Sequence, residues 1–437
     1  MRSRHRVVRT FIALTAVACI LVCRCERQEP NRRNLVPASD VRAAVRDVSL
    51  SHVEAMEVWV PAWSAHVPSS RPESVPRIAY VVYAQRLPTA APSCVAIRGF
   101  TVGEAVTEVP ASAGDLLYYS RHDEGVREIS LSPSGKYLLV AANNRDWIAT
   151  NLNDLWFISV SARRKKALRT DNAGYRYLQW SSDESLLSYI SNEGVPQGMG
   201  GESYNWEIPA TFYIHDVKTG KRTQLVRDTF GSAWVPGHRL IVATSFHEKG
   251  LLLLQSDGKK RTTIRNGTKG GYVALSANGR RIAWNYRRRL RVLEWPASPD
   301  RMFQPDAWRS IGLFEIPEQV WEFAFSPDGK WLALLLPVRS LLENQLVILD
   351  PASGLARKLG LVNGLLVELR WSNSGEHLLF LRRASISSPA ELWAVRAEKT
   401  SLHPFRTLNW SERTLAEYQV LLKFPANTAQ VDWVEAN

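Results

Sequence analysis

The sequence predicts an all-β fold made of repeated units, and three observations favour it. Five segments align without gaps and a sixth, Trp234-VPGHRLIV, is one residue shorter; the five are Leu131-SPSGKYLLV, Trp180-SSDESLLSY, Leu275-SANGRRIAW, Phe325-SPDGKWLAL and Trp371-SNSGEHLLF. Their serines, at 132, 181, 276, 326 and 372, are 49, 95, 50 and 46 residues apart, so the period is near 48. No 3.6-residue apolar period accompanies the repeat, which excludes a helical solenoid. Four short antiparallel strands in a unit of about 40–50 residues are typical of a β-propeller blade.

Each repeat contains the same succession of strands. An aromatic residue or Leu ends the first strand, and a turn of the Pro-Asp-Gly-Lys kind then reverses the chain. An apolar second strand follows, such as Trp331-LALL. The third strands alternate apolar and polar residues: Asp154-LWFISV, Thr211-FYIHDV, Gln345-LVILD and Glu391-LWAV. The expected fourth strands are Lys165-KALR, Arg222-TQLV, Ala356-RKLG and His403-PFRTL.

The two ends of the repeat region each supply part of one more blade. Ala429–Trp433 matches a first strand that stops where its turn should begin, and Arg77-IAYVV matches a second strand without a first. Cys94-VAIRGF and Glu104-AVTEVP then serve as third and fourth strands. Pairing of the N- and C-terminal strands would close the ring and remove its open edge. This favours seven blades, with six as the alternative, and a competing first strand at Val58-WVPAWS stays open.

The repeats resemble the WD40-like repeats of TolB-type propellers. Ser326-PDGKWLALLL is the closest match, and the pattern covers about residues 76–434. The repeats are also similar to the propeller of prolyl-oligopeptidase-like enzymes, but about 27 residues follow the last blade, so no hydrolase domain is expected. Resemblance to the TolB type implies a partner that is another envelope protein or a cell-wall polymer. Propellers have many unrelated functions, so the fold alone does not give the activity.

Residues 1–25 predict export as a signal peptide or lipoprotein signal. A basic start with four Arg precedes an apolar stretch, 10–23, that is short for a bilayer span. Small residues before Cys19 fit a cleavage site, and the run resembles a lipobox in which Cys19 is lipidated. Ala16 stands where a lipobox has Leu, so cleavage with or without lipid stays open, as does a short uncleaved anchor.

Residues 26–75 are expected to form a linker or small N-terminal cap, and 76–437 the propeller. The formal charge is +13; residues 1–18 contain four Arg and no acid, so without them 51 basic and 42 acidic residues leave +9. The basic runs Arg163–Lys166 and Arg287–Arg289 favour solvated turns and protected edge strands over nucleic-acid binding. Attraction to anionic envelope polymers stays open.

The expected first strands place acids in one column of the ring. Three residues before the end of each strand, the column contains Glu128, Tyr177, Gly231, Tyr272, Glu322, Glu368 and Gln430. Because innermost strands line the channel and side chains alternate along a strand, three carboxylates are expected near one mouth. The predicted ligand site at this mouth is Glu128, Tyr177, Tyr272, Glu322, Glu368 and Gln430. These acids could bind a cation or a basic group, or act as acid and base. Alternatively they line a hydrated channel, paired with Arg127, Arg176 or Arg370.

A second candidate surface lies on the loops between second and third strands. The insertion Ser191–Pro209 is Gly-rich, and Trp147, Tyr204 and Trp206 on this side could stack on a sugar or peptide, or pin the loop to its own blade. Gly201-ESYN is one residue from a nucleophile elbow, but that motif needs a strand–turn–helix setting. No catalytic residue is predicted. No metal or cofactor is expected, since no His accompanies the acids with ligand spacing and only Cys94 lies beyond residue 25.

Together these patterns predict an exported, non-catalytic propeller. It would act in the periplasm or cell envelope as a protein- or ligand-binding or assembly module. The expected partner is an envelope protein or a cell-wall polymer, not nucleic acid, and contact with a membrane is expected only through a lipid anchor. The alternative is an enzyme of hydrolase or lyase type with a carboxylate site at the channel mouth.

Overall fold

The computed structural model describes most of the chain from residue 75 to 435. The residues between these ends that it leaves undescribed are 88–93, 103–105, 111–113, 121–125, 143–152, 170–173, 192–210, 228, 246–249, 267–270, 287, 297–300, 317–319, 321, 339–341, 386–387, 411–413 and 426–427. The described residues all belong to one compact unit. Within them no helix is long and apolar enough to cross a membrane.

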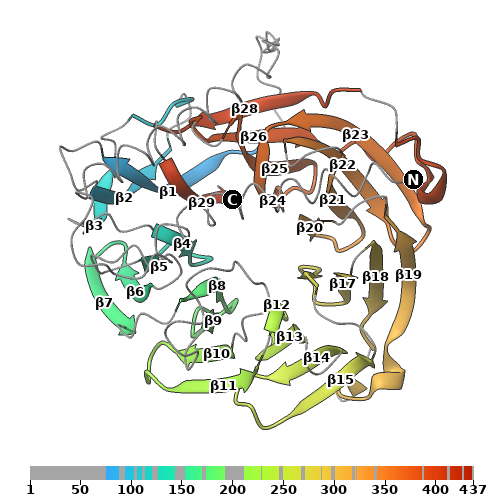
Figure 1. Cartoon of the computed structure of the whole chain (residues 1–437), viewed down its shortest axis with the longest axis horizontal. Helices are drawn as coiled ribbons and strands as arrows, with labels where there is room; N and C mark the ends of the chain where they lie inside the picture. Colours follow the sequence, from blue (N-terminus) through green and yellow to red (C-terminus); the bar gives the residue numbers. More distant parts are fainter. Residues whose placement is uncertain are drawn as a thin grey trace, which may run out of the picture. The chain divides into compact units, whose positions relative to one another are not determined.

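Seven antiparallel sheets form the seven blades of a propeller (Figure 1). Blade 1 contains β29 (Thr428–Glu435), β1 (Ile78–Leu87), β2 (Cys94–Thr101) and β3 (Asp115–Ser120). Blade 2 contains β4 (Val126–Leu131), β5 (Tyr137–Ala142), β6 (Asp154–Ser159) and β7 (Arg164–Arg169). Blade 3 contains β8 (Arg176–Trp180), β9 (Leu186–Ser191), β10 (Thr211–Asp216) and β11 (Arg222–Val226). Blade 4 contains β12 (Thr229–Trp234), β13 (Leu240–Ser245), β14 (Gly250–Gln255) and β15 (Arg261–Asn266).

The remaining three blades follow in chain order. Blade 5 contains β16 (Val273–Leu275), β17 (Arg281–Tyr286), β18 (Arg289–Glu294) and β19 (Arg309–Glu315). Blade 6 contains β20 (Glu322–Phe325), β21 (Leu332–Pro337), β22 (Glu343–Asp350) and β23 (Leu355–Asn363), with β27 (His403–Pro404) added as a fifth strand. Blade 7 contains β24 (Leu365–Trp371), β25 (His377–Arg383), β26 (Glu391–Arg396) and β28 (Tyr418–Lys423). Two short 3₁₀ turns, Pro305–Ala307 and Phe405–Thr407, lie between strands.

The ring is closed by the two ends of the propeller, as the sequence predicts. The blue β1 lies beside the red β29 (Figure 1), and the two strands pair antiparallel with Val81 opposite Trp433 and Tyr83 opposite Val431. The prediction of seven blades is therefore confirmed. The competing strand at 58–64 lies outside the described residues, and the edge of β1 that it would need is occupied by β29.

The predicted fourth strands are confirmed in blades 2, 3 and 6, but the prediction is wrong for blade 1. Its fourth strand is β3, not the segment that begins at Glu104. That segment instead lies beside β28 of blade 7: the amide of Val109 donates to the carbonyl of Lys423 (2.8 Å), and the amide of Lys423 donates to the carbonyl of Thr107 (2.9 Å). Val109 is buried there, in the core between blades 7 and 1.

The fourth strand predicted for blade 7 is also assigned wrongly. His403 and Pro404 pair with Ala356 and Leu355 of β23, at the outer edge of blade 6. Proline lacks a backbone donor and is restricted to such edges, and the next residue, Phe405, is buried in the core of blades 5 and 6. The outer strand of blade 7 is β28.

Two of the tryptophans that end first strands connect neighbouring blades by hydrogen bonds. The indole nitrogen of Trp180 donates to the carbonyl of Ser130 in the preceding blade (3.1 Å), and that of Trp371 donates to Ala324 (2.9 Å). Both rings are otherwise buried among apolar side chains of two sheets. A buried Trp N–H usually has a hydrogen-bond partner, and for these two residues the adjacent first strand supplies it.

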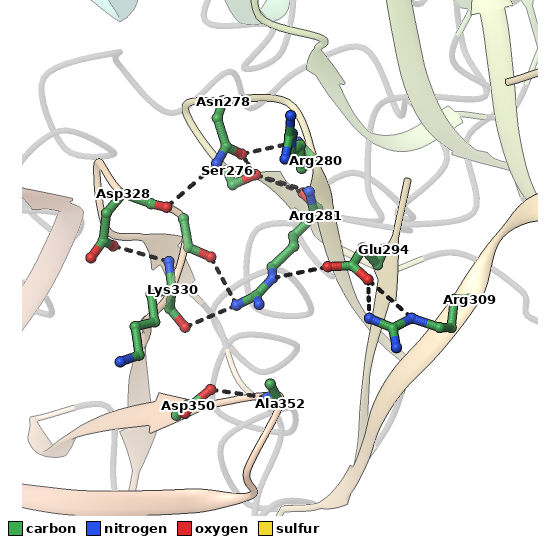
Figure 2. Close-up of polar contacts among 11 residues, drawn as sticks. Ser276, Asn278, Arg280, Arg281, Glu294, Arg309, Asp328, Lys330, Asp350 and Ala352 are labelled. Atoms are coloured by element: carbon green, nitrogen blue, oxygen red, sulfur yellow. Dashed lines mark hydrogen bonds and ion pairs between the residues drawn. The ribbon is translucent and has the colours of Figure 1, made fainter. Parts of the chain in front are cut away.

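The serine that five of the six repeats share fixes the turn between the first two strands. In blade 5 the hydroxyl of Ser276 lies 2.7 Å from Oδ1 of Asn278 and accepts from the amide of Arg281 (2.9 Å) (Figure 2). The turn then contacts blade 6, since the amide nitrogen of the Asn278 side chain donates to the carbonyl of Asp328 (3.4 Å) and Arg281 donates to that of Lys330 (3.1 Å). The same residues therefore form the turn and join it to the next blade.

Candidate functional site

Five of the six residues predicted at the channel mouth interact with one another. The charge of Glu368 acts on both Glu128 and Glu322, while Tyr272 interacts with Tyr177 and Glu322. They come from the first strands of blades 2, 3, 6 and 7 and, for Tyr272, from the residue before β16. The sixth residue, Gln430, is half-buried on β29 opposite Ala84.

Glu128 is bound by the backbone of the next blade. Its two carboxylate oxygens accept separately from the amides of Tyr177 and Leu178, each at 2.7 Å. These amides lie where the pairing of β8 with β9 shifts register between Arg176 and Gln179, and Tyr177 has a φ of 54°. A bulge leaves backbone groups without ladder partners, and the carboxylate supplies the missing acceptors.

Glu322 makes the same contact between blades 6 and 7. It accepts from the amide of Leu369 (2.7 Å) and also interacts with that of Glu368. The register of β24 on β25 shifts between Val367 and Arg370, and Glu368 has a φ of 63°. Each bulge thus combines an acid from one blade with a left-handed non-glycine residue from the next.

The carboxyl groups of Glu128 and Glu322 both have a pKa near neutral pH. Burial raises the pKa of Glu128 to about 7, against the opposing effect of the two amides that it binds. Burial likewise raises the pKa of Glu322 to about 7, with the charge of Glu368 acting in the same direction. Burial together with the charges of Tyr177 and Glu322 raises the pKa of Tyr272 to about 12.

The third carboxylate of the column belongs to an ion-pair group at the ring closure. The Glu368 side chain is 47% exposed and accepts from Nη2 of Arg370 (3.0 Å), which also donates to Oδ1 of Asp432 (2.8 Å). Asp432 also accepts from the amides of Leu131 (2.7 Å) and Trp433 (2.8 Å). One buried carboxylate therefore connects blades 1, 2 and 7.

The site has structural features that the sequence analysis missed. Neither the two bulges nor the role of Asp432 follows from the column of first-strand residues. A signal was present, because the bulged strands share the pattern x-Leu-x-Trp, Tyr177–Trp180 and Glu368–Trp371, and each follows a blade with Glu in the same column. The proposed pairing of acids with Arg holds for Glu368 and Arg370, whereas Glu128 and Glu322 accept from backbone amides.

The remaining predicted residues lie outside the described part of the chain. These are Trp147, Tyr204 and Trp206 on the loop side, and Cys19 in the leader. Their roles stay predictions. Among the described residues, no group of three His, Cys, Asp or Glu is arranged to hold a metal ion.

Substituting Glu128 is expected to change how stability depends on pH. The pKa of Glu128 is about 7 in the folded protein against 4.5 for an ordinary Glu, so the folded state holds the proton more tightly. Its contribution to the free energy of unfolding is then present at low pH and falls as pH rises from about 4.5 to about 7, by roughly 1–3 kcal/mol. Glu128→Gln removes this fall, so urea unfolding between about pH 5 and 8 should give a flatter profile.

At the acidic end, Glu128→Gln should be less stable than the native chain. The Gln amide group then opposes one backbone amide, and a buried donor left without an acceptor costs about 1–3 kcal/mol. Glu315→Gln, on the exposed outer strand β19, is the matched control and should follow the native profile. Parallel profiles for Glu128→Gln and the native chain would contradict the assigned pKa.

The sheet topology defines the class of the protein, a seven-bladed β-propeller. The resemblance to TolB-type and WD40-like propellers is confirmed at the level of this fold. No family model matches the sequence, and no curated protein matches it.

Solved structures with a similar fold include enzymes as well as TolB. An oligogalacturonate lyase in complex with manganese is 12% identical, with a TM-score of 0.49 over 74% of this chain and 87% of that one. The periplasmic gluconolactonase of Pseudomonas aeruginosa is 13% identical, with a TM-score of 0.48 over 81% and 98%. TolB from Acinetobacter baumannii is 14% identical, with a TM-score of 0.40 over 83% and 89%. At these identities the similarity concerns the fold alone.

Proposed function

We propose that this chain is an exported, non-catalytic propeller that binds a protein or polymer of the bacterial cell envelope. One observation favours a binding function over an enzymatic one. The carboxylates of Glu128 and Glu322, which catalysis at the channel mouth would need, accept hydrogen bonds from backbone amides at the bulges of the next blade. Groups engaged in this way hold blades together and are not available to a substrate without opening those contacts.

The proposed location is the periplasm or the envelope surface. Its support is the leader, with a basic start, an apolar stretch and small residues before Cys19. Lipidation of Cys19 would hold the propeller at a membrane, with residues 26–75 as the tether. The partner would then be an envelope protein or a cell-wall polymer, and nucleic acid is not expected.

Cell fractionation tests the location. The full chain, made in a bacterium, is expected to begin at Cys19 and to sediment with the envelope, and Cys19→Ser should release it without changing its melting temperature. Cys23→Ser, four residues further on, is the matched control and should leave the lipidated protein at the membrane. An intact Met1 terminus on a cytosolic pool would contradict export.

Cross-linking in intact cells, followed by mass spectrometry, tests the binding role. A single envelope component should be retained by the native chain and lost after substitution of the surface that contacts it. Loss of this component without change in melting temperature separates a binding surface from a folding defect. If no component is retained reproducibly, the binding role fails.

An enzyme is the second candidate, and one observation favours it. Two carboxyl groups with a pKa of about 7 beside Tyr177 and Tyr272 suit proton transfer near neutral pH. Turnover of a uronate oligomer or a sugar lactone that is lost in Glu128→Gln but kept in Glu315→Gln would establish this alternative. The same substitution should leave partner capture unchanged if the protein is a binding module.

A further inference from the structure

The turns of blades 2, 3 and 4 contain an excess of exposed basic residues. In an antiparallel blade, the turn between the first two strands and the turn between the last two lie at the same end of the sheet. At this end, the turns and the strand starts that follow them contain eleven exposed Lys and Arg, which we call the basic turn cluster: Lys136, Arg163, Arg164, Lys165, Lys166, Lys218, Lys221, Arg239, Lys259, Lys260 and Arg261.

The acids of the same turns are engaged in forming those turns. Asp183 accepts from the hydroxyl groups of Ser181 and Ser185, and Asp216 accepts from the amide of Thr219. These hydrogen bonds lower the pKa of both Asp183 and Asp216. Glu184 and Asp257 likewise accept from backbone amides, at Ser134 and Lys259. These turns therefore contain four acidic and eleven basic residues, and each of the four carboxylates accepts a hydrogen bond that stabilises a turn.

The excess continues in part into blade 5, where Arg280, Arg301 and Arg309 are exposed beside Asp306, and it is absent from blades 6 and 7. At the same end of blades 6 and 7, the exposed charged residues of the turns are balanced in sign: Asp328, Lys330, Glu376, Arg396 and Glu398. Around blades 2 to 4 the bases outnumber the acids of the turns, so the ion pairs that form leave a net positive charge. Arg163 pairs with Asp115, Arg239 with Asp183 (3.7 Å) and Lys259 with Asp257 (3.9 Å). Lys165 lies over the rings of Tyr118 (5.0 Å) and Trp156 (5.2 Å). The cluster is therefore a positive surface at one end of three adjacent blades.

We propose that the basic turn cluster docks on the anionic phospholipid headgroups of a membrane. Headgroups are many, monovalent and laterally mobile, so they match charges that are spread over five turns of three blades. Each Lys or Arg near such a surface contributes to binding, and the attraction acts within about 10 Å of it at ordinary salt. This inference rests on the proposed envelope location, and it adds a contact by the propeller itself to the lipid anchor.

A membrane contact of this kind would supplement the lipid at Cys19. Stable anchoring commonly combines an acyl chain with a polybasic surface. The acyl chain would keep the propeller near the bilayer. The basic turn cluster would orient it with the opposite end, where the second strands end and the third strands begin, away from the headgroups. The ends of blades that bear Glu128 and Glu322 would thus face a partner.

Vesicle co-sedimentation tests the docking surface. The probe is vesicles of phosphatidylcholine with or without phosphatidylglycerol, and the protein is the processed full chain with Cys19→Ser, so that no lipid is attached. The native propeller is expected to bind only the anionic vesicles. Its binding should disappear as the salt concentration is raised from about 0.05 M to about 0.5 M. Combining Lys166→Glu, Lys221→Glu and Lys260→Glu should weaken binding by roughly 100-fold or more.

A matched control makes the same change of charge at the other end of the blades. Arg227 follows β11, Arg289 begins β18 and Lys423 ends β28, and all three are exposed. Combining Arg227→Glu, Arg289→Glu and Lys423→Glu should leave vesicle binding within a few-fold of native. Melting temperatures of both triple variants verify that each still folds.

Three results would overturn the inference. Equal binding to neutral vesicles would mean that charge is not the cause, and equal loss in both triple variants would mean that net charge and not this surface is responsible. Binding to a soluble polyanion such as dextran sulfate, without binding to vesicles, would assign the cluster to an envelope polymer. None of these results changes the fractionation outcome, so the failure of docking and the failure of export are distinguishable.

Discussion

Trp433→Ala is expected to lower the free energy of unfolding by about 3–5 kcal/mol, the usual cost of truncating a buried Trp. The side chain is 4% exposed and is buried among apolar residues of blades 7 and 1. The guanidinium carbon of Arg370 also lies 4.1 Å from the centre of the indole ring. Urea unfolding followed by fluorescence or circular dichroism measures the effect.

The control for this substitution lies in the same blade. Tyr119→Ala, on the outer strand β3, removes an aromatic ring that is 42% exposed and should cost less than about 1 kcal/mol. Ending the chain after Asn427 removes β29 and leaves the inner edge of β1 without a partner, so this variant should fail to fold. A truncated chain that melts like the full-length chain would show that β29 is not needed for closure.

Asp432→Ala is expected to destabilise the protein by about 2–4 kcal/mol, because two buried backbone amides and one guanidinium group lose their acceptor. The Asp432 side chain is 9% exposed and accepts from Arg370, Leu131 and Trp433. Its loss leaves the buried amides of Leu131 and Trp433 without this acceptor, while Arg370, whose side chain is 38% exposed, keeps Glu368 as a partner. Thermal and urea unfolding of Asp432→Ala, Arg370→Met and the double variant should give a coupling above about 1 kcal/mol.

Glu368→Gln is the control for the ion pair. It removes only the 47%-exposed partner of Arg370, and exposed pairs contribute about 0–1 kcal/mol. Its unfolding free energy should therefore stay within about 1 kcal/mol of native. If Asp432→Ala and Glu368→Gln were equally mild, the buried carboxylate would not be what joins the three blades.

The architecture was predictable because its turns are encoded locally. Ser276 and Asn278 form their turn with hydrogen bonds to residues within five positions, so the same short pattern recurs wherever a turn is needed. The repeat period then gives the number of blades. The unfinished first strand at the C-terminus and the unfinished blade at the N-terminus predict how the ring closes.

The outer strands were less predictable because edge pairing depends on distant segments. The segment after Glu104 has the pattern of a strand, yet it lies beside Lys423, more than 300 residues away in the chain. Likewise Phe405 is buried in the core of blades 5 and 6, which places His403 and Pro404 on β23. An alternating pattern shows that a segment can pair, and burial of a neighbouring side chain decides with which sheet.

The candidate site was predicted in part for a similar reason. Alternation along the first strands gives the column in which Glu128, Glu322 and Glu368 stand, and the structure brings them within electrostatic reach. Their partners depend on the bulges at Tyr177 and Glu368, where one extra residue changes the register and points amides at the neighbouring blade. A bulge of this kind does not change the alternation of apolar and polar residues in a way that can be recognised from one strand.

Closure by β29 also determines when the propeller can be completed. A chain is synthesised from its N-terminus, so β1 emerges long before the strand that covers its inner edge. Until Thr428–Glu435 arrives, blade 1 lacks its first strand, and an uncovered edge is a template for pairing with other chains. Thr428–Glu435 therefore finishes the first blade, and a chain translated only as far as blade 7 cannot close its ring.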